Sequence, residues 1–390
     1  MNANRNSLAI GISTTTGRGG VSIGKTNSTS TNGVAMGRDN TTGQTALSLG
    51  INNSVGSHGN SVSIGINNSG TGRGGVTIGV DNSTTSVSGP IAIGKLNRDI
   101  SHGAIAIGYG NTDNSHSAVV IGKGNSGNSG RFTGAKTVVL GLNNLNNGKQ
   151  NNTEGSGETF IAGIGNDENT SGYYFGSNNT HSNQMYVFGA NNTNLRDGDY
   201  GYVFGTGASV EKKVTNSSVM SGMQYGANNT TIDNGYVFGT TNTGRQGGYA
   251  FGAGNYSWLG GLSFGYDNAV TGDSNPTAST EFPMAFGRDN TVTNGGIVFG
   301  ENNTASGTGL AIGANNTSTG SRSLAIGSGV TVSGTNSIGI GLNNTFSGNI
   351  TGNNTFAVIG GRVGIGTVTP NSSYLMEIDG GHLNLSLIHI

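Results

Sequence analysis

The chain has 390 residues, of which 74 are glycine and only 9% are charged, and its formal net charge is −1. This composition excludes the basic surface that nucleic-acid binding needs, and the absence of cysteine excludes disulfides and thiolate metal sites. Apolar residues make up 32% of the chain, too few for one ordinary globular core, yet they recur at regular intervals, which argues against disorder.

From residue 8 onward the chain repeats one short motif: a large apolar residue, a small residue, a large apolar residue and glycine. Leu8–Gly11, Val62–Gly65 and Leu310–Gly313 are three of its copies. Alternation with period two predicts a strand with one buried face. We expect the two large residues of each copy to face inward and the small residue to fill a tight space. The residues chosen to define this repeating core are Leu8, Ile10, Gly11, Val62, Ile64, Gly65, Tyr186, Phe188, Gly189, Leu310, Ile312 and Gly313.

Each motif is followed by a polar segment that predicts a turn. Pairs such as Asn52-Asn53 and Asp81-Asn82 follow the glycine, and Asn, Asp and Gly are the residues that best tolerate left-handed backbone angles. A second, shorter polar segment leads back to the next strand. The motif glycines recur mostly 13 to 15 residues apart, with an irregular stretch between residues 122 and 176. The sequence therefore predicts an all-β protein, a parallel β-solenoid of about two dozen coils.

The strands change in character along the chain, which gives four segments. Residues 1–164 have Ile, Val and Leu in the strands, 165–300 have Phe and Tyr, 301–359 return to the first type, and 360–390 lie beyond the repeat. We expect the phenylalanines to keep the inward register and to fill a wider core. They are Phe175, Phe188, Phe204, Phe238, Phe251, Phe264, Phe286 and Phe299.

Three stretches are longer than one coil and predict loops on one side of the solenoid, where binding residues often lie. They span residues 142–161, 206–225 and 266–285, and their candidate receptor-binding residues are Lys212, Lys213 and Glu281. Simple tolerated insertion is the alternative.

The single tryptophan, Trp258, lies with Tyr256 outside the inward-facing strands. Both suit stacking on a sugar ring or a protein hot spot, and packing against a neighbouring subunit is the alternative.

No residues are arranged for catalysis, for a cofactor or for a metal, so we do not expect an enzyme. The histidines form no ligand-spaced pair, and Asp39, Asp81, Asp267 and Asp289 share a turn position after the glycine. A Ser/Thr column after the Asn pairs resembles ice-binding solenoids, but we expect one mixed column rather than their paired threonine columns. Ice binding and glycan hydrolysis are therefore less favoured functions.

The distribution of apolar residues also predicts self-association. A thin coil with two large apolar residues on one strand leaves one face apolar, and copies of the chain can cover it about a shared axis. No apolar run approaches the roughly 20 residues of a membrane span, so we expect no membrane insertion, and because the repeat begins near Met1 we expect no signal peptide.

The repeat S-[LV]-[AS]-I-G with Asn-rich turns resembles the head of YadA-like trimeric autotransporter adhesins, a left-handed β-roll. The resemblance implies a homotrimeric rod and a role in attachment. Residues Gly360–Gly381 resemble the junction of phage tail fibres and tailspikes that precedes an endosialidase-type intramolecular chaperone. We expect a truncated gene here, with the last six residues, LSLIHI, not biological.

Together these features predict a virion fibre protein, of tail fibre or tailspike type, that attaches to a glycan or protein receptor on a host cell. The alternative is a bacterial trimeric adhesin on the cell surface. Whether the chain is a shaft or the receptor-binding region stays open.

Overall fold

The computed structural model describes residues 2–3, 5–57, 59–84, 88–99, 103–113, 118–127, 137–146, 159–168, 172–181, 185–194, 201–211, 222–272, 282–343, 348–365, 369–370, 372–373 and 375–378. These residues form β-strands and no α-helix, so the described part of the chain has no helix able to cross a bilayer. The chain divides into two compact units, with β1–β29 in the first and β30–β50 in the second.

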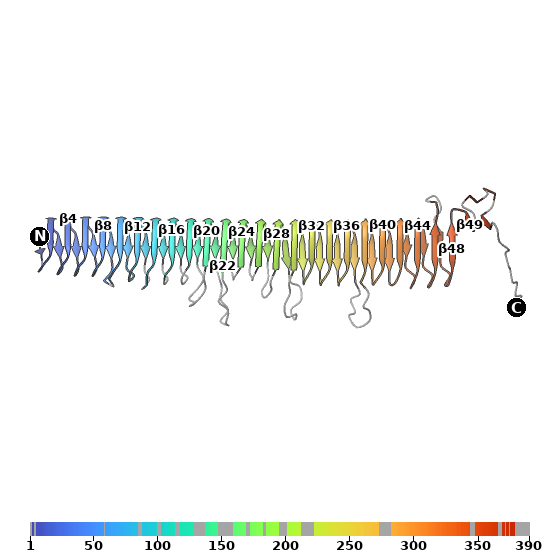
Figure 1. The fold of residues 1–390 in the computed structure, drawn as a ribbon, viewed down its shortest axis with the longest axis horizontal. Helices are drawn as coiled ribbons and strands as arrows, with labels where there is room; N and C mark the ends of the chain where they lie inside the picture. The colour runs from blue at the N-terminus through green and yellow to red at the C-terminus, as the bar shows by residue number, and fades with distance from the viewer. Residues whose placement is uncertain are drawn as a thin grey trace. The chain divides into compact units, whose positions relative to one another are not determined.

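In the first unit, long strands alternate with short ones along the chain (Figure 1). The long strands are β2 (Leu8–Ile12), β4 (Val21–Lys25), β6 (Val34–Arg38), β8 (Leu47–Ile51), β10 (Val62–Ile66), β12 (Val76–Val80), β14 (Ile91–Lys95), β16 (Ile105–Tyr109), β18 (Val119–Lys123), β20 (Thr137–Leu142), β22 (Thr159–Ile164), β24 (Gly172–Ser177), β26 (Met185–Ala190) and β28 (Gly201–Thr206). The short strands are β1 (Asn2–Ala3), β3 (Thr15–Thr16), β5 (Ser28–Thr29), β7 (Thr41–Thr42), β9 (Ser54–Val55), β11 (Ser69–Gly70), β13 (Ser83–Thr84), β15 (Arg98–Asp99), β17 (Thr112–Asp113), β19 (Ser126–Gly127), β21 (Leu145–Asn146), β23 (Asp167–Glu168), β25 (Thr180–His181), β27 (Thr193–Asn194) and β29 (Ser209–Glu211).

The second unit has the same alternation, and most of its short strands are one residue longer. The long strands are β30 (Gly222–Ala227), β32 (Tyr236–Thr240), β34 (Tyr249–Ala253), β36 (Leu262–Tyr266), β38 (Met284–Arg288), β40 (Ile297–Glu301), β42 (Leu310–Ala314), β44 (Leu324–Ser328), β46 (Ile338–Gly341) and β48 (Phe356–Ile359). The short strands are β31 (Thr230–Ile232), β33 (Thr243–Arg245), β35 (Tyr256–Trp258), β37 (Ala269–Thr271), β39 (Thr291–Thr293), β41 (Thr304–Ser306), β43 (Thr317–Ser318), β45 (Val330–Val332) and β47 (Gly348–Ile350). A separate parallel pair, β49 (Val363–Ile365) and β50 (Met376–Ile378), follows.

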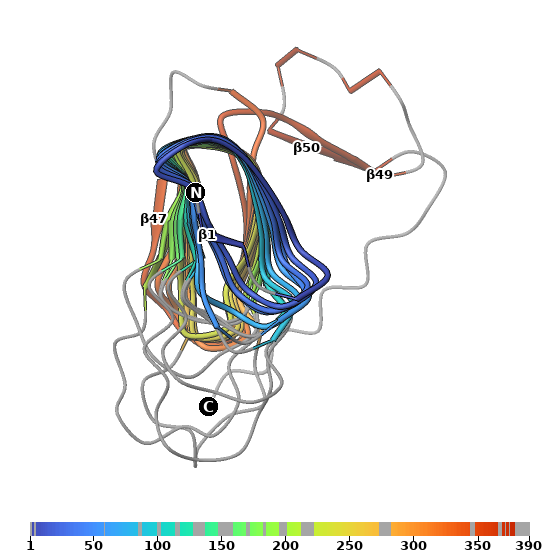
Figure 2. The same cartoon turned by 90° about the vertical axis from the view of Figure 1, so that its left-hand side faces the viewer.

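Each unit is a parallel β-solenoid, as the repeat predicted. Long strands pair in parallel with long strands of the neighbouring coils, and short strands with short ones, so that the motif glycines lie in register. Seen down the stack, the two sets of strands form two sides of each coil (Figure 2).

The described strands between residues 122 and 176 continue the regular stacking, contrary to our expectation. Gly141 pairs with Gly122 and with Gly163, and Gly163 pairs with Gly176, so two further coils lie in this stretch. Their longer spacing in the sequence concealed the repeat.

The interior of each solenoid is lined by the small residues of the motif, and the predicted inward position of the large residues is wrong. Ala311 is fully buried between Leu310 and Ile312, which are only partly buried. Leu8 and Ile10 are about half exposed, at 47% and 50%. Val62, Ile64, Tyr186 and Phe188 lie on the same outer side as these residues.

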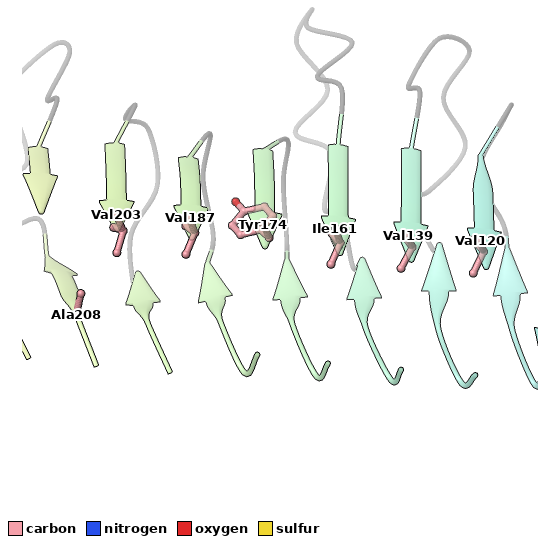
Figure 3. Close-up of a cluster of buried hydrophobic side chains, with 7 residues drawn as sticks. All are labelled: Val120, Val139, Ile161, Tyr174, Val187, Val203 and Ala208. Carbon is pink, nitrogen blue, oxygen red and sulfur yellow. The ribbon is translucent and has the colours of Figure 1, made fainter. Parts of the chain in front are cut away.

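The reason is the short distance between the two sets of strands. A Cβ added to Gly244 on β33 would lie 2.8 Å from Cγ2 of Val237 on β32, so no large side chain fits at this coil. Val270, Ala285, Val292, Val298, Ala305 and Ala311 form one such thin core. In the first unit, Tyr174 is the exception among mostly smaller residues and points between the two sets of strands (Figure 3).

A column of buried asparagines closes the turn after most of the long strands; Thr14, Ala208 and Val330 stand in its place after β2, β28 and β44. In the pairs that follow the motif glycine, the first residue has a left-handed backbone, as predicted, with φ of 53° at Asn52 and 56° at Asp81. The second residue is buried and bonds to its counterparts in both neighbouring coils. Asn303, for example, donates from its backbone N to Asn290 Oδ1 at 3.0 Å, and its own Oδ1 accepts from the backbone N of Asn316 at 2.9 Å. This column fixes the register of the coils, because each member satisfies buried polar groups of the next.

Candidate association and receptor-binding surfaces

In each unit, the outer side of the long strands is a continuous apolar surface, which we call the apolar face. It consists of the first and third residues of each motif. In the second unit these are Met223, Tyr236, Tyr249, Leu262, Met284, Ile297, Leu310, Leu324, Ile338 and Phe356 in one column, and Tyr225, Phe238, Phe251, Phe264, Phe286, Phe299, Ile312, Ile326, Ile340 and Val358 in the other. In the described coils of both units, neither position holds a charged residue. Soluble monomers rarely expose an apolar surface that continues over so many strands.

Aromatic rings stack along this face, which corrects the expectation that the phenylalanines fill the core. Phe251 and Phe264 have ring centroids 4.5 Å apart and an interplanar angle of 5°. The contact continues from Phe264 to Phe286 at 5.3 Å and from Phe286 to Phe299 at 5.1 Å. Phe299 nevertheless remains 43% exposed. Stacking within one chain therefore covers the ring faces and leaves their outer edges open to a partner.

Charged side chains lie at the ends of the long strands, immediately after the motif glycine. Arg288 donates to Glu301 of the next coil, and this hydrogen bond is the main cause that raises the pKa of Arg288. The Nζ atoms of Lys95 and Lys123 lie 5.9 and 5.8 Å from the ring centroid of Tyr109. These charges border the apolar face without interrupting it.

Tyr256 and Trp258 are the first and third residues of β35 and point away from the interior, while Ser257 between them is fully buried. They lie outside the motif strands, as predicted, on a short strand, and both are half-buried rather than fully exposed. In register on the preceding coil lie Thr243 beside Tyr256 and Arg245 beside Trp258.

Two contacts hold the indole of Trp258 in place. The Cζ atom of Arg245 lies 4.9 Å from the centre of the ring, a cation–π arrangement. The indole Nε1 donates a hydrogen bond to Oε1 of Gln246. Gln246 and Leu259 both have a left-handed backbone, with φ of 46° and 52°, at the turns beside these residues. The ring is therefore held in position before any ligand arrives.

On the outer side of the short strands, the single mixed hydroxyl column that we expected is joined by a second run of hydroxyl residues on β37, β39 and β41, formed by Thr271, Thr293 and Ser306. Because most short strands of the second unit have three residues, both the first and the third point outward. Thr291 and Thr293 on β39 are in register with Thr304 and Ser306 on β41. Sequence analysis missed the second run because the three-residue length of these strands is not visible in the repeat.

The remaining candidates are either turn residues or outside the described chain. Asp39, Asp267 and Asp289 have left-handed φ of 57°, 51° and 56°, as their turn position predicts. Within the residues that the structure describes, no three His, Asp or Glu side chains come close enough to bind a metal ion. Lys212, Lys213 and Glu281 lie outside the described residues.

No protein-family model matches the chain, and no curated protein matches it.

Proposed function

We propose that this chain is a structural and adhesive fibre protein, of phage tail fibre or tailspike type, that forms homotrimers and attaches to a receptor on a host cell surface. The observation that carries the proposal is the apolar face, because an uncharged surface of this extent needs a partner that covers it.

A second copy of the chain matches this face better than an unrelated protein would. The two apolar columns recur at every coil in constant register, with neighbouring strands roughly 4.8 Å apart. A copy aligned in parallel presents the same columns at the same spacing. The number of three copies comes from the resemblance to the trimeric adhesin heads.

Self-association through the long strands would leave the short strands in contact with solvent. Their outward residues are mainly Thr and Ser, with Tyr256 and Trp258 as the large aromatic exceptions in the second unit. Aromatic residues of this kind are common hot spots of recognition. The division into an apolar face and a polar face supports a fibre that assembles with one side and binds with the other.

Replacing Phe264 by Glu should weaken association at least about a hundredfold, because like charges would be buried near a shared axis. Sedimentation equilibrium should give a trimer for the wild-type chain and a monomer for Phe264→Glu at low micromolar concentration. Thr41→Glu, which adds the same charge to an exposed residue of β7, should remain a trimer. A monomeric wild-type chain would contradict the assembly.

Attachment is tested with the fluorescently labelled wild-type chain on a panel of Gram-negative and Gram-positive cells. We expect saturable binding to a subset of strains, which competition with unlabelled protein abolishes. Absence of saturable binding to every strain would contradict the adhesive function, whatever the oligomeric state.

A bacterial trimeric adhesin would need the same apolar face. The tail-fibre-like sequence at Gly360–Gly381 favours the phage fibre.

A further inference from the structure

A step in height crosses the outer surface of the short strands in the second unit. On one side of the step stand the large side chains of Tyr256 and Trp258. On the other side, in register on β37, lie Ala269 beside Tyr256 and Thr271 beside Trp258. The next two coils continue the low side with small hydroxyl residues. We call this low surface the hydroxyl shelf; it consists of Ala269, Thr271, Thr291, Thr293, Thr304 and Ser306.

The two faces of the Trp258 indole differ in what covers them. Arg245 of the preceding coil covers one face, with its Cζ 4.9 Å from the ring centre. The neighbour on the following coil is Thr271, roughly 4.8 Å away along the stack. Because a threonine side chain is much shorter than an indole, the outer part of the second ring face extends beyond Thr271. An aromatic wall therefore stands at the edge of the hydroxyl shelf.

We propose that this step binds the pyranose units of a cell-surface glycan. The C–H face of a sugar ring packs on a flat aromatic surface, and its hydroxyls exchange hydrogen bonds with threonine and serine hydroxyls, which both donate and accept. The shelf carries no charged residue, so the expected ligand is an uncharged sugar unit. That the glycan belongs to a host cell rests on the adhesive function proposed above.

The indole of Trp258 is fixed by contacts within the chain, which is typical of a binding residue and not of an aromatic side chain that happens to be exposed. The contacts with Arg245 and Gln246 fix the ring before binding, so little side-chain entropy remains to be lost. Two hydroxyl runs alone would also suit a flat ice surface. The wall formed by Tyr256 and Trp258 breaks that plane. It favours a ligand that contacts the wall and the hydroxyl shelf at the same time.

Because Trp258 is the only tryptophan, its fluorescence reports on this site alone. The wild-type chain is titrated with maltohexaose, cellohexaose and chitohexaose, and is applied to an array of bacterial surface polysaccharides. We expect a saturable fluorescence change with at least one hexaose or one polysaccharide identified on the array. Thr271→Leu, which fills the low side of the step, should abolish that change.

Variants of the wall then test its role on the array. Trp258→Ala should lower glycan affinity about tenfold or more, the loss of one well-packed aromatic contact, while Trp258→Phe keeps part of it. Thr41→Leu, on an exposed position of the first unit, is the matched control and should bind like the wild type. A wild-type chain that binds no glycan, or that shows thermal hysteresis in ice instead, overturns the proposal.

The outcome on cells separates this site from the adhesive function. If Trp258→Ala and Thr271→Leu bind cells and glycans as well as the wild type does, attachment stands and this site is wrong. If the wild-type chain binds glycans through Trp258 but binds no cell, the site stands and the host-attachment function fails.

Discussion

Gly300→Ala should destabilise the second unit severely. Gly300 has φ of 123°, and an added Cβ would lie 1.9 Å from the carbonyl oxygen of Gly313 in the next coil. Backbone atoms must therefore move apart, and the same movement disturbs the hydrogen bond from Asn303 Nδ2 to Gly313 O. We expect a loss of more than about 4 kcal/mol in the free energy of unfolding of the coils around it. Thermal unfolding followed by circular dichroism, with hydrogen exchange to locate the loss, measures this.

Gly307→Ala is the control in the same coil. Gly307 also has a left-handed backbone, with φ of 56°, but an added Cβ meets nothing within 4 Å. Only the backbone strain of alanine remains, about 1 kcal/mol. Equal losses of stability in Gly300→Ala and Gly307→Ala would show that the stacking of the motif glycines does not restrict the side chain at Gly300.

Asn303→Ala should cost about 3 to 5 kcal/mol, because several buried polar groups lose their partners at once. The backbone N of Asn316 loses the Oδ1 acceptor at 2.9 Å, and the carbonyl of Gly313 loses the Nδ2 donor at 2.7 Å. Water cannot replace the lost partners readily, since Asn303 is 1% exposed. The measurement is chemical denaturation of the full chain, together with hydrogen exchange of the Asn316 backbone amide, which reports on the second unit.

The adjacent residue, Asn302, provides the comparison. It is exposed and has φ of 52°, and its side-chain Nδ2 donates to Oδ1 of Asn315, which is also exposed, at 2.7 Å. Asn302→Gly keeps the left-handed backbone and should change stability by less than about 1 kcal/mol. If Asn303→Ala is as mild as Asn302→Gly, the buried column does not hold the coils together.

The strands, the turns and the parallel stacking were predicted correctly from the sequence, whereas the side of the strands that faces the interior was predicted wrongly. Period two shows that one side of a strand is buried but does not say which side. The middle position of the motif, however, holds small residues in most coils, as at Ala35, Ser63 and Ala311. A restriction on size indicates the tighter space, and this signal could have identified the interior.

The two asparagines of each pair were also distinguishable in principle. The first position varies, with Asp39, Gly110 and Thr241 among its residues, because only a left-handed backbone is needed there. The second position is almost always Asn, because its Oδ1 accepts from the backbone N of the next coil while its Nδ2 donates to a backbone carbonyl, as at Asn303. Sequence reasoning assigned both residues to the turn and missed the column.

For the candidate site, the position of Tyr256 and Trp258 outside the motif strands was predictable, but their surroundings were not. Arg245 and Thr271 lie 13 residues from Trp258 on either side, and only the pairing of β35 with β33 and β37 brings them to its two faces.

The asparagine column has a genetic consequence. Successive members are separated by 13 residues between Asn166 and Asn179 and by 22 between Asn144 and Asn166, yet they make the same hydrogen bonds. Each coil thus needs only a matching neighbour, not a particular place in the gene. Unequal recombination between similar repeats would add or delete whole coils in frame and leave every junction well formed, so populations of this gene should differ chiefly in copy number.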